Sequence, residues 1–195
     1  MQADTTARGA QRLFPLFKWA VYGLLSLNVV LFLIGQTLVE AKDSLAWVLL
    51  LLLFEWETRQ LAAGALGART RRLLHGGRAL AYLVIVGAAV EYSSASFRSE
   101  YGDLDAWNAW TWILVTLLLE AELWFPQRYG PVAWLLRNGT KTLLYGALAA
   151  YAIAWGMDGE WLDGYDASLW ILCFFVIELN VFGLERPDTG AAAQA

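Results

Sequence analysis

Six apolar segments, each close to the length that crosses a membrane, constrain the fold of this chain more than any other feature. A helix rises about 1.5 Å per residue, so about 20 residues span the roughly 30 Å hydrocarbon core of a bilayer. A chain with 58% hydrophobic residues also cannot bury its apolar surface in one soluble core of ordinary composition. We therefore expect an all-α integral membrane protein. The segments occupy residues 15–38, 44–62, 78–96, 106–125, 140–156 and 166–184.

The charges between these segments alternate in sign, and this alternation predicts the orientation of the chain. Basic residues cluster before the first segment, between the second and third, and between the fourth and fifth, whereas the other loops are acidic. Because basic loops stay on the cytoplasmic side, both termini are expected in the cytoplasm. Residues 1–14 would form a cytoplasmic segment, 15–185 the transmembrane domain and 186–195 a disordered cytoplasmic tail. The expected location is a cell membrane, most simply a bacterial inner membrane, with multiple spans.

A threefold internal repeat underlies the six segments. Trp47, Trp112 and Trp170 each precede a glutamate by eight residues. The pattern W-x7-E-x-[EN] then continues two residues later with Glu57, Glu122 and Asn180. The segment before each copy also carries a basic residue followed four positions later by tyrosine: Lys18 and Tyr22, Arg78 and Tyr82, Lys141 and Tyr145.

Each repeat unit is one helical hairpin, and all three hairpins run in the same direction through the membrane. Repeats of the same orientation are related by an axis along the membrane normal. The sequence therefore predicts six transmembrane helices arranged as three parallel hairpin repeats around a pseudo-threefold axis. The hairpins cover about residues 15–62, 78–125 and 140–184.

The repeated carboxylates are the candidate functional residues. If the repeat tryptophans mark the outer membrane interface, a glutamate eight residues further lies about 12 Å deeper, near the midplane. Ionisable side chains at that depth are costly and are functional by default. We expect Glu55, Glu120 and Glu178 to form one layer that binds cations or protons. Flanking polar positions are Glu57, Glu122, Glu91, Asn28 and Asn180.

A structural role for the same residues is the alternative. Glu55 and Arg59 are spaced i, i+4 with the acid first, which favours an ion pair within the helix. Glu57 and Glu122 could each meet a basic residue of a neighbouring hairpin and clamp the repeats together. The basic-x3-Tyr pairs are typical of side chains that anchor a helix end at the membrane interface.

Several functions are disfavoured by composition. One cysteine and one histidine exclude a disulfide framework, a thiolate cluster and a conventional zinc or bis-histidine haem site, so no cofactor is expected. Without a nucleophile and base set we expect no enzyme. Nucleic acid is not an expected partner, and the identity of any bound metal ion stays open.

Two functions remain. The first is a small cation channel or proton-coupled cation transporter that uses the mid-membrane carboxylates, because anionic oxygens replace the hydration shell of hard cations. The second is a non-transporting accessory or scaffold subunit of a larger membrane complex, bound to a membrane-protein partner or to further copies of itself. An excess of carboxylate over basic groups in the membrane would favour transport, whereas full pairing would favour the scaffold.

Overall fold

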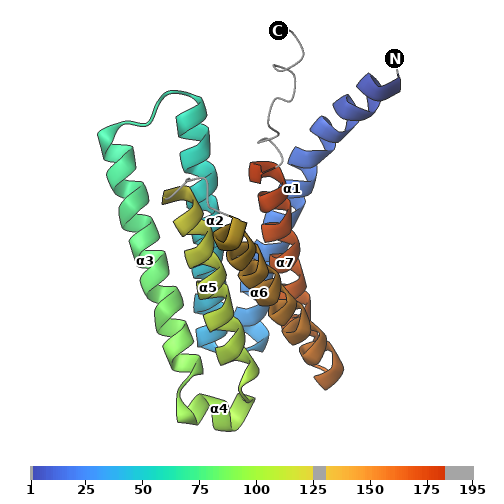
Figure 1. The fold of residues 1–195 in the computed structure, drawn as a ribbon. Coiled ribbons are helices and arrows are strands. Elements are labelled where there is room, and N and C mark those ends of the chain that lie inside the picture. The colour runs from blue at the N-terminus through green and yellow to red at the C-terminus, as the bar shows by residue number, and fades with distance from the viewer. Residues whose placement is uncertain (1, 125–130, 183–195) are drawn as a thin grey trace.

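The computed structural model describes residues 2–124 and 131–182, with the backbone alone at 2–15, 122–124, 131, 133–134 and 175–182. Over these residues the chain is all-helical, as predicted, with seven helices and no strand (Figure 1). The helices are α1 (Gln2–Gly35), α2 (Leu38–Ala62), α3 (Ala68–Tyr92), α4 (Ala95–Tyr101), α5 (Leu104–Trp124), α6 (Pro131–Asp158) and α7 (Trp161–Phe182).

The six long helices cover most of the six predicted apolar segments. The short helix α4 lies between the two long helices of the middle repeat, where the connecting chain is longer than in the other two repeats. α1 begins at Gln2, so residues 2–14 lie in the same helix as the first apolar segment. The predicted tail at 186–195 lies outside the described residues.

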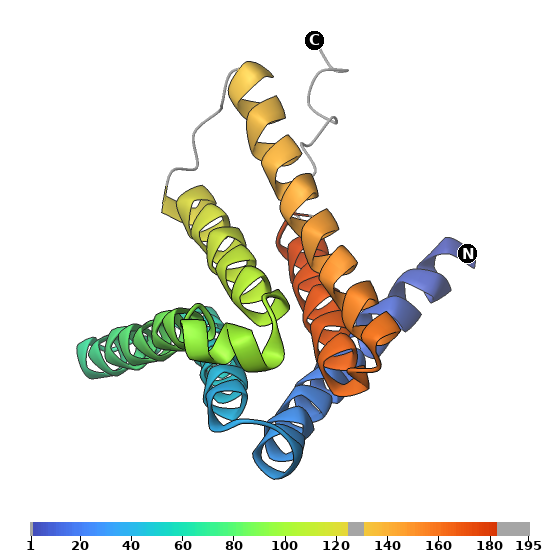
Figure 2. The same cartoon turned by 90° about the horizontal axis from the view of Figure 1, so that it is seen from below.

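The long helices form a closed ring of neighbours. α1 contacts α2, α2 contacts α3, α3 contacts α5, α5 contacts α6, α6 contacts α7, and α7 returns to α1. Figure 2 shows these helices arranged around a common centre. The start of α1 and the end of α7 lie at one end of the bundle, and α4 lies at the other end (Figure 1). We call the end that holds α4 the acidic end, because the acidic loops are found there.

Local sequence signals explain the turns at the acidic end. Thr37 caps α2 by accepting a hydrogen bond from the backbone N–H of Glu40, and the Glu40 carboxylate accepts one from the Thr37 N–H in return. Gly102 and Gly159 have φ values of 91° and 90°, a left-handed region that side chains disfavour. These glycines allow the chain to turn sharply into α5 and α7.

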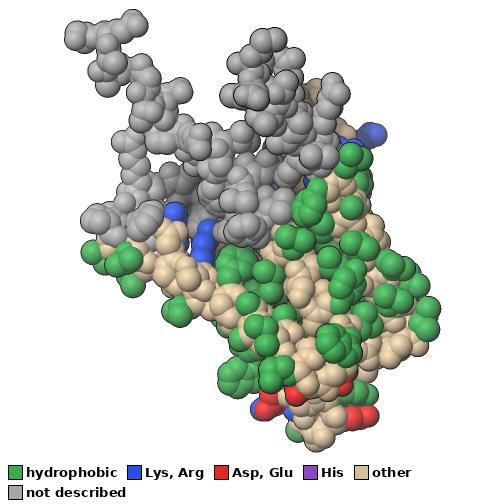
Figure 3. Space-filling model, turned by 90° about the vertical axis from the view of Figure 1, so that its right-hand side faces the viewer, with side chains coloured by type: hydrophobic (Ala, Val, Ile, Leu, Met, Phe, Trp, Pro, Cys, Tyr) green, Lys and Arg blue, Asp and Glu red, His purple; other side chains and the backbone are tan. Residues whose placement is uncertain are grey.

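Large apolar side chains cover the outside of the bundle. Every long helix exposes them, and Leu83 on α3 and Leu143 on α6 are 72% and 76% exposed. Figure 3 shows apolar side chains over the middle of one face and acidic side chains near the acidic end. Within the described residues, Leu16–Gly35 and Ala68–Tyr92 are long and apolar enough to cross a membrane by length and composition. This criterion supports two spans and does not establish the six predicted ones.

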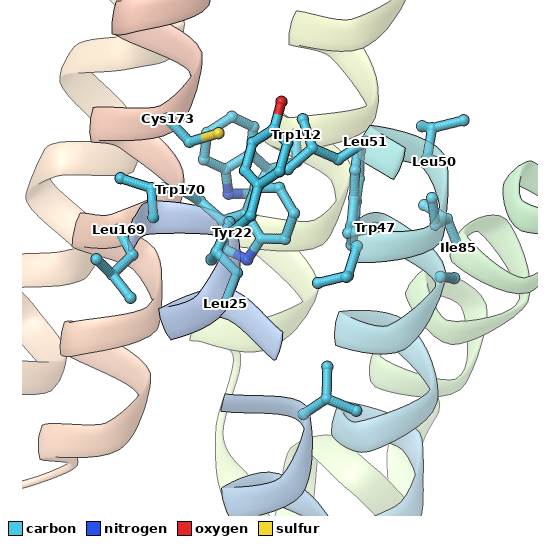
Figure 4. Packing of buried hydrophobic residues seen from close by; sticks show 14 of the residues in the cluster. Tyr22, Leu25, Trp47, Leu50, Leu51, Ile85, Trp112, Leu169, Trp170 and Cys173 are labelled. Carbon is cyan, nitrogen blue, oxygen red and sulfur yellow. The ribbon is translucent and has the colours of Figure 1, made fainter. Parts of the chain in front are cut away.

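The core contains the repeat tryptophans. Trp47 of α2, Trp112 of α5 and Trp170 of α7 are all buried. The Trp47 ring centroid lies 6.3 Å from that of Trp112 and 6.1 Å from that of Trp170, and the three rings converge in the centre of the bundle (Figure 4). The expectation that these residues mark the lipid interface is therefore wrong. Their rings point inward because aromatic packing among themselves and with Phe174 stabilises the centre.

Candidate functional site

A pocket opens at the acidic end of the bundle, and five carboxylates line it. Its empty volume is about 590 Å³, part of which is open to solvent. None of the described residues that line it is basic. We call it the acidic pocket. Its lining residues are Phe32, Glu40, Asp43, Ser44, Trp47, Tyr92, Asp105, Asn108, Trp112, Trp155, Asp163, Asp166, Ala167, Trp170 and Phe174.

The polar lining follows the threefold repeat. Seven residues before each repeat tryptophan stands an acid, and four residues before it stands an aspartate or asparagine. The repeat is therefore longer than W-x7-E-x-[EN] and begins with [DE]-x2-[DN]-x3-W. Because seven and four residues are about two turns and one turn of a helix, each acid lies on the same helix face as its tryptophan. The first layer is Glu40, Asp105 and Asp163, and the second is Asp43, Asn108 and Asp166.

Aromatic rings of the other helices complete the walls. Ten residues after each repeat tyrosine, α1, α3 and α6 place one buried aromatic side chain beside the acids. These are Phe32, Tyr92 and Trp155. The repeat tryptophans and Phe174 form the floor. All six helices of the ring thus contribute equivalent positions to one cavity.

Hydrogen bonds from α1 hold the α7 side of the pocket. The Asn28 amide Nδ2 donates to Asp166 Oδ1 over 2.8 Å, and Asn28 is fully buried. Gln36 Nε2 donates to Asp163 Oδ2 over 3.0 Å. These bonds join the first and last repeats, so neutral amides, and no basic side chain, position two of the five carboxylates.

Three buried oxygen atoms in the lining have no hydrogen-bond partner among the described residues. They are Asp43 Oδ1, Ser44 Oγ and Asn108 Oδ1. The Ser44 side chain is only 5% exposed. Buried polar atoms normally find a partner, and leaving one unsatisfied costs about 1–3 kcal/mol. Acceptors from α2 and α5 are thus available to a bound donor.

The carboxylates at the mouth of the pocket influence one another. Asp105 and Asp163 lie at the starts of α5 and α7, before the apolar segments 106–125 and 166–184. Burial, and after it the nearby charge of Glu40, raises the pKa of Asp105 and of Asp163 to about 7. Near neutral pH the pocket can therefore gain or lose protons, and a bound cation would favour the ionised form.

The predicted glutamates that the structure describes are mostly paired. Glu55 accepts hydrogen bonds from Lys18 Nζ at 2.8 Å and from Arg59 Nε at 2.9 Å, so the ion pair expected from the i, i+4 spacing is confirmed. Glu57 forms an ion pair with Arg78 of the next hairpin, the clamp considered above. Arg78 also stacks on the Phe54 ring, 4.0 Å from its centroid.

Glu120 accepts a hydrogen bond of 2.8 Å from the Tyr82 hydroxyl, so α3 and α5 are joined within the middle hairpin. We call Glu55, Glu57 and Glu120 the paired glutamates. Three residues of the basic-x3-Tyr pairs, which the sequence suggested as membrane anchors, thus contact these glutamates: Lys18 from α1 and Arg78 and Tyr82 from α3.

The remaining predicted residues are placed apart from one another. Glu91 is 52% exposed and pairs with Lys42 at 3.2 Å, outside the pocket lining. Asn28 reaches the pocket through Asp166. The side chains of Glu122, Glu178 and Asn180 lie outside the described residues, so their expected places in the carboxylate layer are untested.

The five pocket acids were expected in the acidic loops between the apolar segments, and none of them was a predicted site residue. The signal that would have found them is their fixed spacing before each repeat tryptophan. The substitution of Asn108 for aspartate in the middle copy concealed this signal, as did the wrong placement of the tryptophans at the lipid interface.

The donor set of the acidic pocket suits a cation but not a tightly chelated metal. Within the part of the chain that the structure describes, no group of three His, Cys, Asp or Glu residues is placed to hold a metal ion. The pocket therefore offers negative charge, free acceptors and aromatic faces in a space larger than a bare ion requires. No family model matches this chain, and no curated protein and no solved structure matches it.

Proposed function

We propose that this protein is a six-span membrane protein of three parallel hairpins around a pseudo-threefold axis, with its acidic end outside the cell. Support comes from exposed leucines on each long helix and from polar side chains, such as Asn28, in the interior. Such an inside-out distribution fits a bilayer, where lipid covers the apolar surface. The closed ring of helix contacts fits three equivalent hairpins.

Within this architecture the protein binds a cation in the acidic pocket. The observation that carries the proposal is that five carboxylates line one cavity without a basic residue among its described lining. Such an excess of negative charge is stable only when protons or another cation neutralise it. Acidic side chains around the mouth also raise the local cation concentration. The lining residues that the structure describes include no base-activated nucleophile, so the proposed role is binding and transport, without catalysis.

Transport fits a gated carrier better than an open channel. The rings of Trp47, Trp112 and Trp170 fill the centre below the pocket. A cation would load from the acidic end, and these rings would have to separate before it could pass toward the paired glutamates. Exchange with protons is then natural, because the carboxylates at the mouth titrate near neutral pH.

The accessory-subunit alternative has one observation in its favour. Among the side chains that the structure describes, the paired glutamates all contact basic or hydroxyl groups. A subunit of this kind would use the pocket to bind a cationic segment of a membrane-protein partner, or would assemble with copies of itself.

Flux through the purified protein in liposomes tests the proposal. The panel is H⁺, Na⁺, K⁺, Mg²⁺, Ca²⁺ and small alkylammonium ions, with the acidic end exposed to the cation. The double variant Asp43→Asn, Asp166→Asn should abolish movement of the transported cation. Asp103→Asn removes one charge from the same end, on an exposed residue paired with Arg98, and should leave flux unchanged.

Two results would overturn parts of the proposal. If folded wild-type protein moves none of these cations but binds one, the accessory role is supported and transport is refuted. If it neither binds nor moves any of them, the acidic pocket is not a cation site.

A further inference from the structure

We propose that the cation bound in the acidic pocket is the primary ammonium group of a small organic amine. This inference rests on the proposed cation-binding function and names the chemical class of its ligand. It follows from three features of the lining: unpartnered acceptors, aromatic walls and the spacing of the carboxylates.

The unpartnered acceptors match the donors of a primary ammonium. An R–NH₃⁺ group has three N–H donors and no acceptor. The lining offers three buried oxygens without a partner, Asp43 Oδ1, Ser44 Oγ and Asn108 Oδ1. Hydrogen bonds between charged donors and such acceptors are stronger than neutral ones. A quaternary ammonium would neutralise the charge but would leave all three oxygens unsatisfied.

The aromatic walls favour a cation that has an organic body. Phe32, Tyr92 and Trp155 are buried beside the carboxylates, and the repeat tryptophans lie below them. An ammonium group gains attraction from ring faces, and an alkyl chain gains by leaving water for an apolar wall. A hydrated inorganic ion gains little from seven aromatic side chains in one pocket.

The carboxylates are arranged for a larger ligand than a metal ion. A calcium site needs six to eight oxygen ligands at about 2.3–2.6 Å. No three acidic residues among those described approach such a geometry. The acidic pocket is partly open to solvent, so its mouth can accommodate the organic part of a ligand whose ammonium group enters the lining.

Titration calorimetry on the full chain in lipid nanodiscs separates these ligand classes. The probes are n-butylammonium, methylammonium, tetramethylammonium, Na⁺ and Ca²⁺ at about pH 8, where the mouth carboxylates are mostly ionised. We expect n-butylammonium to bind most tightly. Methylammonium should bind about 60-fold more weakly, because it lacks three CH₂ groups that are worth about 0.8 kcal/mol each when buried. Tetramethylammonium and the two metal ions should bind more weakly than methylammonium.

Two variants and one control connect the ligand to the lining. Ser44→Ala removes one unpartnered acceptor and should weaken n-butylammonium about tenfold, with little change for tetramethylammonium. The double variant Asp43→Asn, Asp166→Asn should weaken every cation. Asp103→Asn should match wild type. Thermal unfolding confirms that each variant is folded, and Ser44→Ala, a small truncation, provides the test if the double variant fails to fold.

Each other outcome overturns a specific part of the inference. If Na⁺ or Ca²⁺ binds and n-butylammonium does not, the ligand is inorganic, whereas the cation-binding function stands. Tighter binding of tetramethylammonium than of n-butylammonium would refute the hydrogen-bonded ammonium. If no probe binds to folded wild-type protein, both the ligand class and the cation-binding function are refuted.

Discussion

The same sequence repeat places carboxylates at two levels of one bundle, in the paired glutamates and in the acidic pocket. The two groups differ in whether basic side chains neutralise their charge. Eight residues beyond the repeat tryptophan, Glu55 meets Lys18 and Arg59. Four and seven residues before the tryptophans, five carboxylates meet one another and neutral groups, among them amides, the Thr37 hydroxyl and the indoles of Trp47 and Trp170. The comparison teaches that partners, more than depth in the bundle, decide whether a buried carboxylate stabilises the fold or is available to a ligand.

The tryptophan layer between the two regions should be the most sensitive part of the bundle. Trp47→Ala removes contacts with Trp112, Trp170 and Phe174, and we expect a loss of about 3–5 kcal/mol in the free energy of unfolding. Thermal unfolding in detergent measures it. Trp107→Ala is the matched control. The Trp107 side chain is 59% exposed, so its removal should change stability little. Equal effects of the two variants would show that the tryptophans do not join the repeats.

Removing a basic partner tests whether the paired glutamates are structural. Arg78→Met leaves the Glu57 carboxylate without its partner in a partly buried position, and the expected loss is about 3 kcal/mol. Adding Glu57→Gln should restore part of the stability, because the uncompensated charge is gone. Chemical unfolding of the two single variants and the double variant gives the coupling energy.

Arg71→Met, at an exposed position of the same helix, controls for the loss of positive charge. If Arg78→Met instead leaves stability unchanged and abolishes cation flux, the paired glutamates belong to the transport path, and the distinction between the two regions fails.

The sequence predicted the all-helical class, because hydrophobic segments are local features, whereas the six-span arrangement of the threefold repeat stays a prediction. The Arg59–Glu55 ion pair could also be predicted from the sequence, since side chains at positions i and i+4 meet on any helix. The rotation of each helix about its own axis could not be predicted from the sequence. Whether Trp47 faces lipid or the centre depends on contacts with Trp112 and Trp170, which lie 65 and 123 residues away in the sequence. Once the tryptophans were assigned to the outside, the acids one and two turns before them were assigned to loops.

The acidic pocket should make the ligand-free protein less stable as the pH rises. For Asp105 and Asp163 the folded-state pKa of about 7 lies above the unfolded value of 3.8. The unfolded chain therefore loses these protons first, and stability falls between about pH 4 and about pH 7. Allowing for solvent screening at partly exposed carboxyls, we expect a combined loss on the order of 2 kcal/mol.

Thermal unfolding across this pH range checks the sign of that effect. The double variant Asp105→Asn, Asp163→Asn should make the profile shallower, because the amides mimic the protonated acids. Some slope should persist, because burial raises the pKa of Asp43 to about 8 and this acid still titrates. Stability that rises with pH in wild type would mean that the pocket acids have favourable partners, as the paired glutamates do. The contrast between the two regions would then disappear.

Among the variants considered, loss of the Lys42–Glu91 ion pair should have the smallest effect on stability and on cation binding. Glu91 nevertheless lies at the acidic end of the bundle. Its two side chains are 55% and 52% exposed and lie 3.2 Å apart, and exposed ion pairs contribute about 0–1 kcal/mol. Glu91→Gln should therefore lower stability by less than about 0.5 kcal/mol and should leave cation affinity within about twofold of wild type. Calorimetric titration measures the affinity and thermal unfolding the stability. Because Glu91 lies outside the pocket lining, a large loss of cation binding in this variant would show that total charge at the acidic end, and not the pocket, controls binding.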